Sequence, residues 1–306
     1  MSPRVIPTAK IVFFGTDAFS VPSLIQLIED GWNVVAVVTK PDAPTGRGRQ
    51  ITEPAVKRLA VSQGIKVFQP LRLSDIEADL KALHAEIGIV VAYGKIIPAS
   101  MLGLFPKGFI NVHGSLLPRY RGAAPIEAAI INGDSETGVT LMQLEAGMDT
   151  GPTYDESRIQ LDGTEHREEV YERLAELGAD LLVEHLPSIL EGQIVPIPQD
   201  ASAATTVTRI SKADGIIDWT KPTEILEREI RAYQGWPGSR TQISGVDVTI
   251  TAAHITSGAG SGGMAHQTAD GDLAVYAGDG ALVIDQLKPA GKREMSGRDF
   301  LRGHAL

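Results

Sequence analysis

The sequence predicts an α/β domain built on a mostly parallel sheet, followed by a small antiparallel β-barrel. Three observations support this fold class. The chain has 306 residues, which is too long for one small core and suits two domains. Apolar strands alternate with amphipathic helices over the first two-thirds of the chain. Short strands separated by glycine fill the last third, as in small barrels.

The amino-terminal part opens with a strand–helix–strand unit, which is typical of a parallel sheet. We expect strands at 10–14, 34–39, 66–68, 87–92, at 109 onward and at 137–144, and helices near 21–29, 54–63, 75–83, 126–131 and 165–191. Only Gly15 stands where a dinucleotide-binding fingerprint needs three glycines, and no P-loop sequence is present. The pattern therefore does not support a nucleotide cofactor.

The most informative stretch begins at Phe109 as an apolar strand and continues into a loop rich in proline and glycine. Asn111 and His113 are two positions apart, so their side chains leave the strand on the same side. Polar residues at a strand end can simply hold a loop. An amide and an imidazole followed by two arginines are more than a core strand needs, and the carboxyl ends of strands are where open α/β sheets keep their sites. The stretch therefore favours a functional site.

A second candidate is Asp149, which lies in a loop punctuated by glycine after the strand expected at 137–144. An isolated Asp in such a loop is most often a turn former. The separation of 36 residues from His113 accommodates one helix and one strand. That is enough for two adjacent strands to present their ends together.

Two basic segments are candidates for binding phosphate, because guanidinium groups present planar, paired donors. The first is the loop 40–49, in which Gly46 and Gly48 flank Arg47. The second is near the carboxyl terminus and contains Lys288, Lys292, Arg293, Arg298 and Arg302. A flexible, solvated connector is the alternative for the first segment, and a solvated face is the alternative for the second.

Composition limits the partners and the setting. The net charge is −10, with 17 Lys and Arg against 26 Asp and Glu in residues 1–207, and 11 against 12 in residues 208–306. This argues against whole-surface binding of nucleic acid and leaves room for local basic patches. The lack of cysteine agrees with a cytoplasmic location. We expect no membrane span and no signal peptide, because no apolar run approaches about 20 residues and the amino terminus lacks an apolar core.

The run Asn-Val-His-Gly-Ser-Leu-Leu-Pro-Arg-Tyr-Arg-Gly-Ala-Ala-Pro-Ile at 111–126 resembles the signature of the folate-dependent formyltransferases. Three outer motifs resemble those of the members that act on tRNA: Pro-Asp-x-Pro-x-Gly-Arg-Gly around Arg47, Met-Asp-Thr-Gly around Asp149, and the run from Lys288 to Phe300. The resemblance covers nearly the whole chain. Its departures are the extension before Lys10, which carries no motif, and the acidic total.

The resemblance implies both an architecture and an activity. It implies a Rossmann-like formyltransferase catalytic domain over residues 1–192, a linker over 193–207, and an OB-like β-barrel domain over 208–306 that assists tRNA binding. The expected reaction moves the formyl group of 10-formyltetrahydrofolate, the co-substrate, to the free α-amino group of methionyl-initiator tRNA by direct amine attack. The expected enzyme is a monomer that uses no metal and no membrane, and the seven histidines include no HExxH motif.

The resemblance also assigns roles, residue by residue. Catalysis is assigned to Asn111, His113 and Asp149; folate binding to Ser115, Leu116, Leu117 and Pro118; and contact with the aminoacyl end of tRNA to Arg47. As the amine adds, negative charge collects on the formyl oxygen, and donors from Asn111 and a protonated His113 would stabilise it. Asp149 would either favour and orient the charged imidazole or accept the amine proton, and both roles remain open.

Two other functions compete with this interpretation. A formyltransferase that acts on an amino-sugar nucleotide or on glycinamide ribonucleotide would share the catalytic trio, but the Gly-Arg-Gly loop and the carboxyl-terminal run count against it. A tRNA- or nucleotide-binding module without chemistry would have no use for Asn111, His113 and Asp149 together.

Overall fold

The structure is a computed structural model that describes residues 8–45 and 50–306. The chain forms two compact units. The first contains residues up to 123, 137–159 and 171–207, and the second contains 124–136, 160–170 and 208–306. The second unit thus includes two segments that precede residue 192 in the sequence. Within the described ranges, no helix combines the length and the apolar character that crossing a membrane requires.

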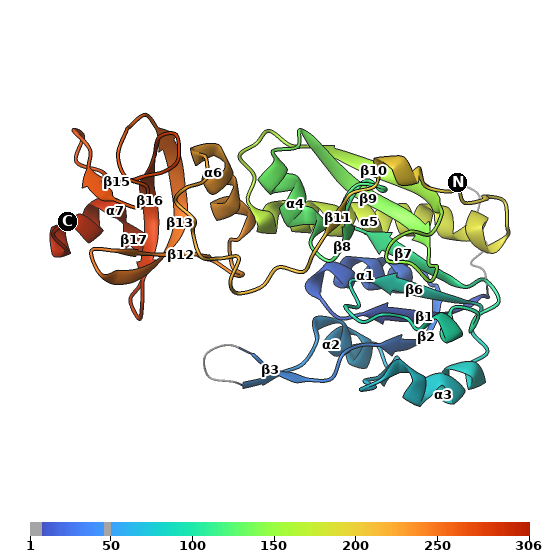
Figure 1. Cartoon of the computed structure of the whole chain (residues 1–306). Helices are drawn as coiled ribbons and strands as arrows, with labels where there is room; N and C mark the ends of the chain where they lie inside the picture. The colour runs from blue at the N-terminus through green and yellow to red at the C-terminus, as the bar shows by residue number, and fades with distance from the viewer. Residues whose placement is uncertain (1–7, 46–49) are drawn as a thin grey trace. The chain divides into compact units, whose positions relative to one another are not determined.

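The first unit is built on a seven-stranded sheet with the order β10-β9-β7-β6-β1-β2-β5 (Figure 1). The strands are β1 Lys10–Gly15, β2 Asn33–Val38, β5 Lys66–Phe68, β6 Ile87–Val91, β7 Phe109–His113, β9 Glu136–Gln143 and β10 Thr153–Gln160. Pairing is parallel from β5 through β7, whereas β9 runs antiparallel to β7. The predicted α/β class with a mostly parallel sheet is confirmed.

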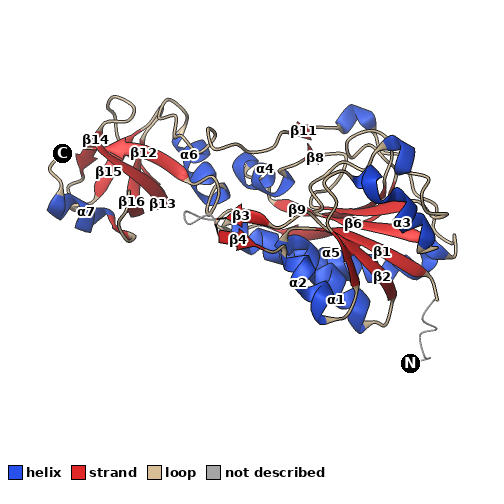
Figure 2. Ribbon diagram, turned by 90° about the horizontal axis from the view of Figure 1, so that it is seen from below, coloured by secondary structure: helices blue, strands red, loops and turns tan. Residues whose placement is uncertain are grey.

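Helices cover both faces of this sheet. They are α1 Val21–Glu29, α2 Ala55–Ser62, α3 Glu77–Ala82 and α5 Arg167–Leu190, with short 3-10 turns at Ala18–Ser20, Leu73–Ile76 and Ala99–Met101. Figure 2 shows α1, α2 and α5 on one face and α3 on the other. Phe14 of β1 packs with Phe105 and Phe109 in the core beneath α3. Near-continuous apolar strands are what a sheet covered on both faces requires.

Two short strand pairs lie outside the large sheet. Strand β3 Ala43–Thr45 pairs antiparallel with β4 Gln50–Thr52. Strand β8 Arg121–Gly122 pairs parallel with β11 Thr206–Val207. The second pair ties the segment expected to be a linker, 193–207, to the signature stretch.

Strand β10 was not predicted from the sequence. Its eight residues, TYDESRIQ, are half-buried or exposed and lie at the edge of the sheet. An edge strand with one solvent-exposed face needs few apolar residues, so its hydrophobic pattern in the sequence is weak.

The second unit combines helices with an antiparallel sheet. Helix α4 Pro125–Asn132 ends at Gly133 in the left-handed conformation that glycine favours at helix ends. It packs against α6 Thr223–Ala232, which also contacts the sheet. Arg231 of α6 is buried, and it bonds to Glu227 through two nitrogens and to the Glu165 carbonyl oxygen at 2.8 Å.

The sheet of this unit has the order β12-β13-β16-β15-β14, with β17 also paired to β16. Its elements are β12 Ser239–Ile243, β13 Val246–Thr256, β14 Ala265–Gln267, β15 Leu273–Tyr276, β16 Ala281–Pro289, β17 Met295–Ser296 and helix α7 Gly297–Gly303. The sheet curls around a core that includes Ile250, Leu282, Leu287 and Phe300. This agrees with the small barrel-like domain expected for the carboxyl-terminal part.

Close packing between α5 and β7 makes a stability prediction possible. A Cβ atom at Gly178 of α5 would lie 2.6 Å from Val112 Cγ1, so Gly178→Leu overpacks this contact. We expect the substitution to lower the free energy of unfolding by about 1–3 kcal/mol, measured by urea denaturation. Gly103→Leu is the control, because Gly103 is exposed with nothing within 4 Å of its Cβ position. Its expected change is below about 0.5 kcal/mol, and equal losses in the two variants would contradict the argument.

Candidate active site

Strand β7 delivers two polar side chains into the interior of the first unit. Asn111 is 9% exposed and His113 is 6% exposed, and alternation along the strand puts them on the same face. Polar groups at such depth cost free energy unless they are hydrogen-bonded. Two buried polar side chains in an otherwise apolar strand do not serve core packing. Residues of this kind are expected at functional sites.

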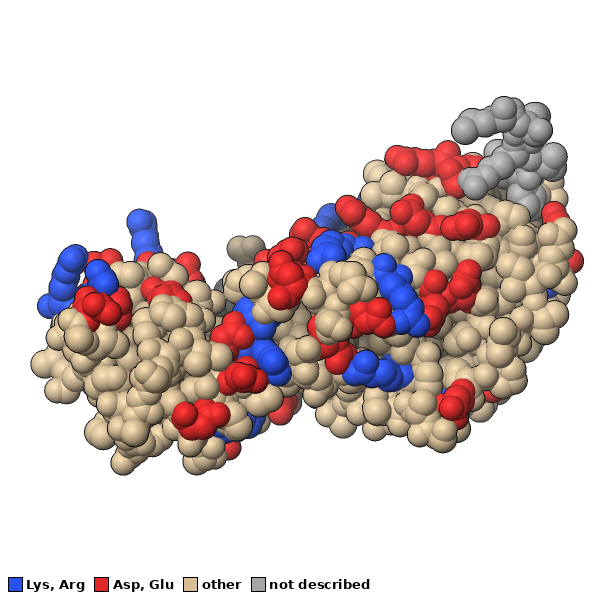
Figure 3. Space-filling model, turned by 90° about the horizontal axis from the view of Figure 1, so that it is seen from above, with Lys and Arg blue, Asp and Glu red and all other residues tan. Residues whose placement is uncertain are grey.

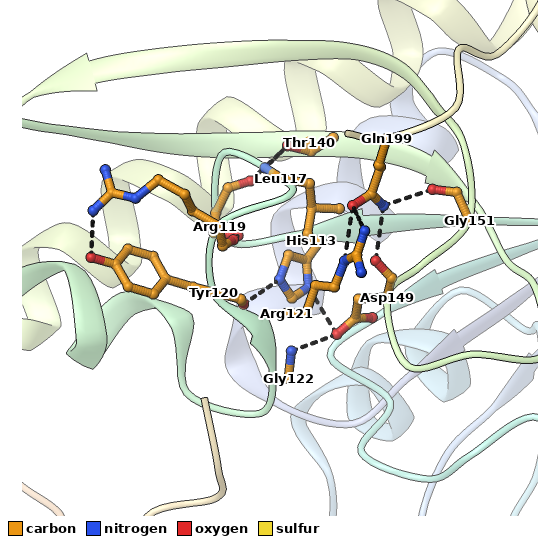
Figure 4. A network of polar contacts seen from close by, with 11 residues as sticks. His113, Leu117, Arg119, Tyr120, Arg121, Gly122, Thr140, Asp149, Gly151 and Gln199 are labelled. Atoms are coloured by element: carbon orange, nitrogen blue, oxygen red, sulfur yellow. Dashed lines mark hydrogen bonds and ion pairs between the residues drawn. The ribbon is translucent and has the colours of Figure 1, made fainter. Parts of the chain in front are cut away.

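The contacts of His113 identify which ring nitrogen carries a hydrogen. Nε2 lies 3.1 Å from the Tyr120 carbonyl oxygen (Figure 4). Because a carbonyl can only accept, this contact assigns the hydrogen to Nε2. Nδ1 faces the Asp149 carboxylate with a distance of 3.8 Å to Oδ2. Nδ1 is therefore the ring nitrogen that the structure presents to the Asp149 side chain.

The Asp149 carboxylate is held by the backbone of β8. Its Oδ2 accepts a hydrogen bond of 2.8 Å from the Gly122 N–H. Gly122 has φ +122°, and a Cβ atom there would lie 2.0 Å from the Val207 carbonyl oxygen of β11. Only glycine fits this backbone, so the position of the donor for Asp149 depends on the glycine in the signature stretch.

The antiparallel direction of β9 corrects the expectation that two adjacent strands present their ends together. Ile110 is opposite Gln143 and His113 is opposite Thr140, so the carboxyl ends of β7 and β9 lie at opposite edges of the sheet. The loop after β9 brings Asp149 back to His113. The two residues meet as predicted, but through a loop rather than through matching strand ends.

Residues 115–118, the expected folate-binding segment, form a loop that is fixed to β9. Thr140 Oγ1 donates to the Ser115 carbonyl oxygen at 2.7 Å and accepts from the Leu117 N–H at 3.0 Å. The Ser115 hydroxyl is fully buried and donates to the Arg119 carbonyl oxygen at 2.7 Å. Leu116 and Pro118 are the half-buried residues of the four. The serine side chain is thus occupied within the loop.

Arg47, the expected tRNA contact, lies outside the described residues. On either side of it in the sequence, β3 and β4 pair with each other. The chain just before β3 is anchored at Asp42, which accepts from Gln69 at 2.7 Å and pairs with Lys57 at 2.7 Å. The hydrogen bond from Gln69, followed by that from Lys57, holds the pKa of Asp42 below its ordinary value.

The structure adds a residue that sequence reasoning missed. Gln199 bonds to the backbone of the Asp149 loop and to the Arg121 side chain of β8 (Figure 4). Its segment has two prolines and no periodicity, so nothing in the sequence distinguishes this glutamine from other polar loop residues. Within residues 8–45 and 50–306, no group of three or more side chains is arranged to hold a metal ion.

Comparison of the sequence with known proteins identifies its family. The sequence profile for formyl transferase matches residues 9–186, and that for the formyl transferase carboxyl-terminal domain matches residues 209–305. The methionyl-tRNA formyltransferase of Myxococcus xanthus is 44% identical over 97% of this chain and 96% of its own length. That of Halorhodospira halophila is 44% identical over 97% of both chains.

Solved structures show the same fold at much lower identity. An N-formyltransferase from Helicobacter canadensis, in complex with folinic acid and dTDP-3-aminofucose, is 19% identical with a TM-score of 0.67, covering 94% of this chain and all of its own. HypX from Aquifex aeolicus in complex with tetrahydrofolic acid is 16% identical with a TM-score of 0.63, covering 96% of this chain and 47% of its own. The chain therefore belongs to the formyl transferase family, within which its relatives at 44% identity are methionyl-tRNA formyltransferases.

Proposed function

We propose that this protein transfers the formyl group of 10-formyltetrahydrofolate to the α-amino group of methionyl-initiator tRNA. The observation that carries the proposal is the pairing of His113 with Asp149 at 3.8 Å, in a chain that is 44% identical to methionyl-tRNA formyltransferases over 97% of its length. The motifs around Arg47 and in the run 288–300 favour tRNA over a small amine. A cytoplasmic location and a monomeric state remain predictions from the sequence.

The proposed reaction proceeds by direct attack. The neutral amine adds to the formyl carbon, and negative charge develops on the formyl oxygen. Hydrogen-bond donors from Asn111 and protonated His113 stabilise that oxygen more in the transition state than in the ground state. The bond from the formyl carbon to N10 of the folate then breaks, the amine loses a proton, and N10 gains one.

Asp149 and His113 divide the proton handling in this proposal. Their side chains are 17% and 7% exposed, so water screens their interaction less than at the surface. The carboxylate faces Nδ1 and holds the orientation of the imidazole, which acts as the proton donor or acceptor for the reacting atoms. Alternatively, the carboxylate accepts the amine proton through water. Both roles need the carboxylate where the Gly122 N–H holds it.

The proposed folate site lies along residues 115–118. The bonds from Thr140 fix the backbone of this loop, and Leu116 and Pro118 contribute half-buried apolar surface. A preformed loop loses less conformational freedom when it binds a ligand, which favours affinity.

The proposed contribution of the carboxyl-terminal unit to tRNA binding is local. Arg298 is tied to Asp272 by two bonds, and Arg302 pairs with Asp299 at 2.7 Å. The other three members of the expected phosphate patch are exposed basic residues, namely Lys288, Lys292 and Arg293. Figure 3 shows basic and acidic side chains interspersed on the face that it presents. This distribution supports contact through patches rather than through a whole basic surface.

The direct test offers the purified protein three amines with 10-formyltetrahydrofolate. These are methionyl-initiator tRNA, an amino-sugar nucleotide and glycinamide ribonucleotide. We expect formylation of the tRNA-bound methionine with a kcat/KM far above that of either small amine. Faster turnover of a small amine would overturn the proposal and support the alternative within the family.

Arg47→Ala is expected to weaken the use of tRNA and to leave folate binding unchanged. Loss of one phosphate contact reduces electrostatic attraction, so we expect KM for methionyl-tRNA to rise by about tenfold, with a shallower dependence on salt. Steady-state kinetics with each substrate varied in turn measure both effects. Arg58→Ala is the control, because Arg58 is an exposed arginine on α2. Equal changes in KM for tRNA and for folate would contradict the assignment of Arg47.

A further inference from the structure

Gln199 uses its whole amide group inside the candidate site. Nε2 donates to the Asp149 carbonyl oxygen at 2.8 Å and to the Gly151 carbonyl oxygen at 2.7 Å. Oε1 accepts from Arg121 Nε at 3.0 Å and from Arg121 Nη2 at 2.7 Å. Both amide hydrogens and the amide oxygen therefore form hydrogen bonds. Figure 4 shows the side chain bonded to Arg121 on one side and to the loop of Asp149 and Gly151 on the other.

The backbone that Gln199 binds has an unusual conformation. Asp149 has φ +52°, in the left-handed region that costs most residues about 1–2 kcal/mol and that Asp tolerates best after Gly and Asn. Two residues further along, Gly151 is packed so closely that a Cβ atom would lie 1.9 Å from the Gln143 carbonyl oxygen. The two hydrogen bonds that Gln199 donates to the Asp149 and Gly151 carbonyls favour the backbone arrangement that aims the Asp149 carboxylate at His113.

The other end of Gln199 reaches the element that binds the carboxylate. Arg121 precedes Gly122 in β8, and the Gly122 N–H donates to Asp149 Oδ2. Gln199 therefore connects the backbone of the Asp149 loop to the strand that holds its side chain. The segment 193–207 completes this arrangement, because it also supplies β11, which pairs with β8.

We propose that Gln199 is a positioning residue for Asp149, which assumes the formyl transfer proposed above. An amide suits the position because it donates two hydrogen bonds and accepts two. A glutamate would keep the contact with Arg121 but would set a carboxylate against two carbonyl oxygens. The segment 193–207 then contributes to the geometry of the reaction in addition to linking the two parts of the chain.

Kinetics of three variants test the proposal. Gln199→Ala removes the amide, and Gln199→Glu keeps the size and the acceptor but removes the donors. Gln193→Ala is the matched control, because Gln193 lies in the same segment and bonds to exposed Glu191. We expect both Gln199 variants to lower kcat by about 10- to 100-fold, with little change in either KM, since small misplacements of reacting groups have effects of this size. Activity of Gln199→Glu equal to that of the wild type would overturn the proposal.

A double-mutant cycle separates positioning from a general structural role. If Gln199 acts through Asp149, then Gln199→Ala in an Asp149→Asn background lowers kcat by less than about threefold further. A full additional loss in that background would overturn the inference. Melting temperatures of all variants are measured alongside. Gln199 is half-buried, so water can reach the carbonyl oxygens that lose their donor when its side chain is replaced. We therefore expect small shifts in melting temperature.

Hydrogen exchange keeps this inference distinguishable from the proposed function. If the wild type fails to formylate methionyl-tRNA, the proposed function fails. The role of Gln199 is then decided by amide exchange over residues 145–152, which we expect to be faster in both Gln199 variants than in the wild type and in Gln193→Ala. Unchanged exchange in this loop would overturn the inference whatever the substrate.

Discussion

Replacing His113 by alanine is expected to lower kcat for formyl transfer by about 10²- to 10⁴-fold, the range of a lost general acid or base. Imidazole is a common general acid or base in enzymes, and Nδ1 of His113 is 3.8 Å from the Asp149 carboxylate. The KM values should change much less, because the interaction is made mainly in the transition state. Steady-state turnover with methionyl-tRNA measures the effect.

A histidine outside the site provides the control for His113. His254 lies 2.9 Å from Asp285, but its side chain is 61% exposed and belongs to the second unit. We expect His254→Ala to leave kcat unchanged. The His113 variant also removes the hydrogen bond to the Tyr120 carbonyl, which costs about 1–3 kcal/mol of stability, so its unfolding is measured as well. A folded His113→Ala with normal turnover would remove His113 from the mechanism.

Asp149→Asn should lower kcat by about 10²-fold through loss of charge alone. Asparagine has the same shape, tolerates the left-handed backbone at φ +52°, and can still accept the Gly122 N–H with its amide oxygen. The loop therefore keeps its position while the negative charge beside His113 disappears. Because the two groups act together, the double variant His113→Ala/Asp149→Asn should be little worse than His113→Ala.

Asp285→Asn is the matched control for Asp149, because Asp285 is also a carboxylate beside a histidine but is 42% exposed. Exposed ion pairs contribute about 0–1 kcal/mol, and this pair belongs to the second unit, so kcat should not change. Independent, additive losses for His113 and Asp149 would show that they do not form a functional pair.

Much of the large sheet could be predicted because buried strands have a strong local signature. The apolar runs at β1, β2 and β6 appear where the sequence predicted them, and helix α1 spans the predicted residues 21–29. The edge strand β10 could not be predicted in this way, because a half-exposed strand has no such run. The domain boundaries implied by the resemblance stay predictions.

The candidate site was likewise predictable only in part from the sequence. The resemblance predicted catalytic roles for Asn111, His113 and Asp149, which stay predictions, and the structure brings His113 and Asp149 to 3.8 Å. The route differed, because β9 pairs antiparallel with β7. Strand direction depends on which partner a strand finds in space, and the local sequence of β9 is compatible with either direction.

By itself, the sequence determined the fold class, the family, and the residue types available for chemistry, because hydrophobic periodicity and motif spacing are local properties of the chain. Only the tertiary structure decided how those residues meet. The Asp149 loop, strand β8 and the segment around Gln199 are far apart in the sequence and form one hydrogen-bonded network. The partner in each bond is set by the packing of the whole unit rather than by neighbouring residues.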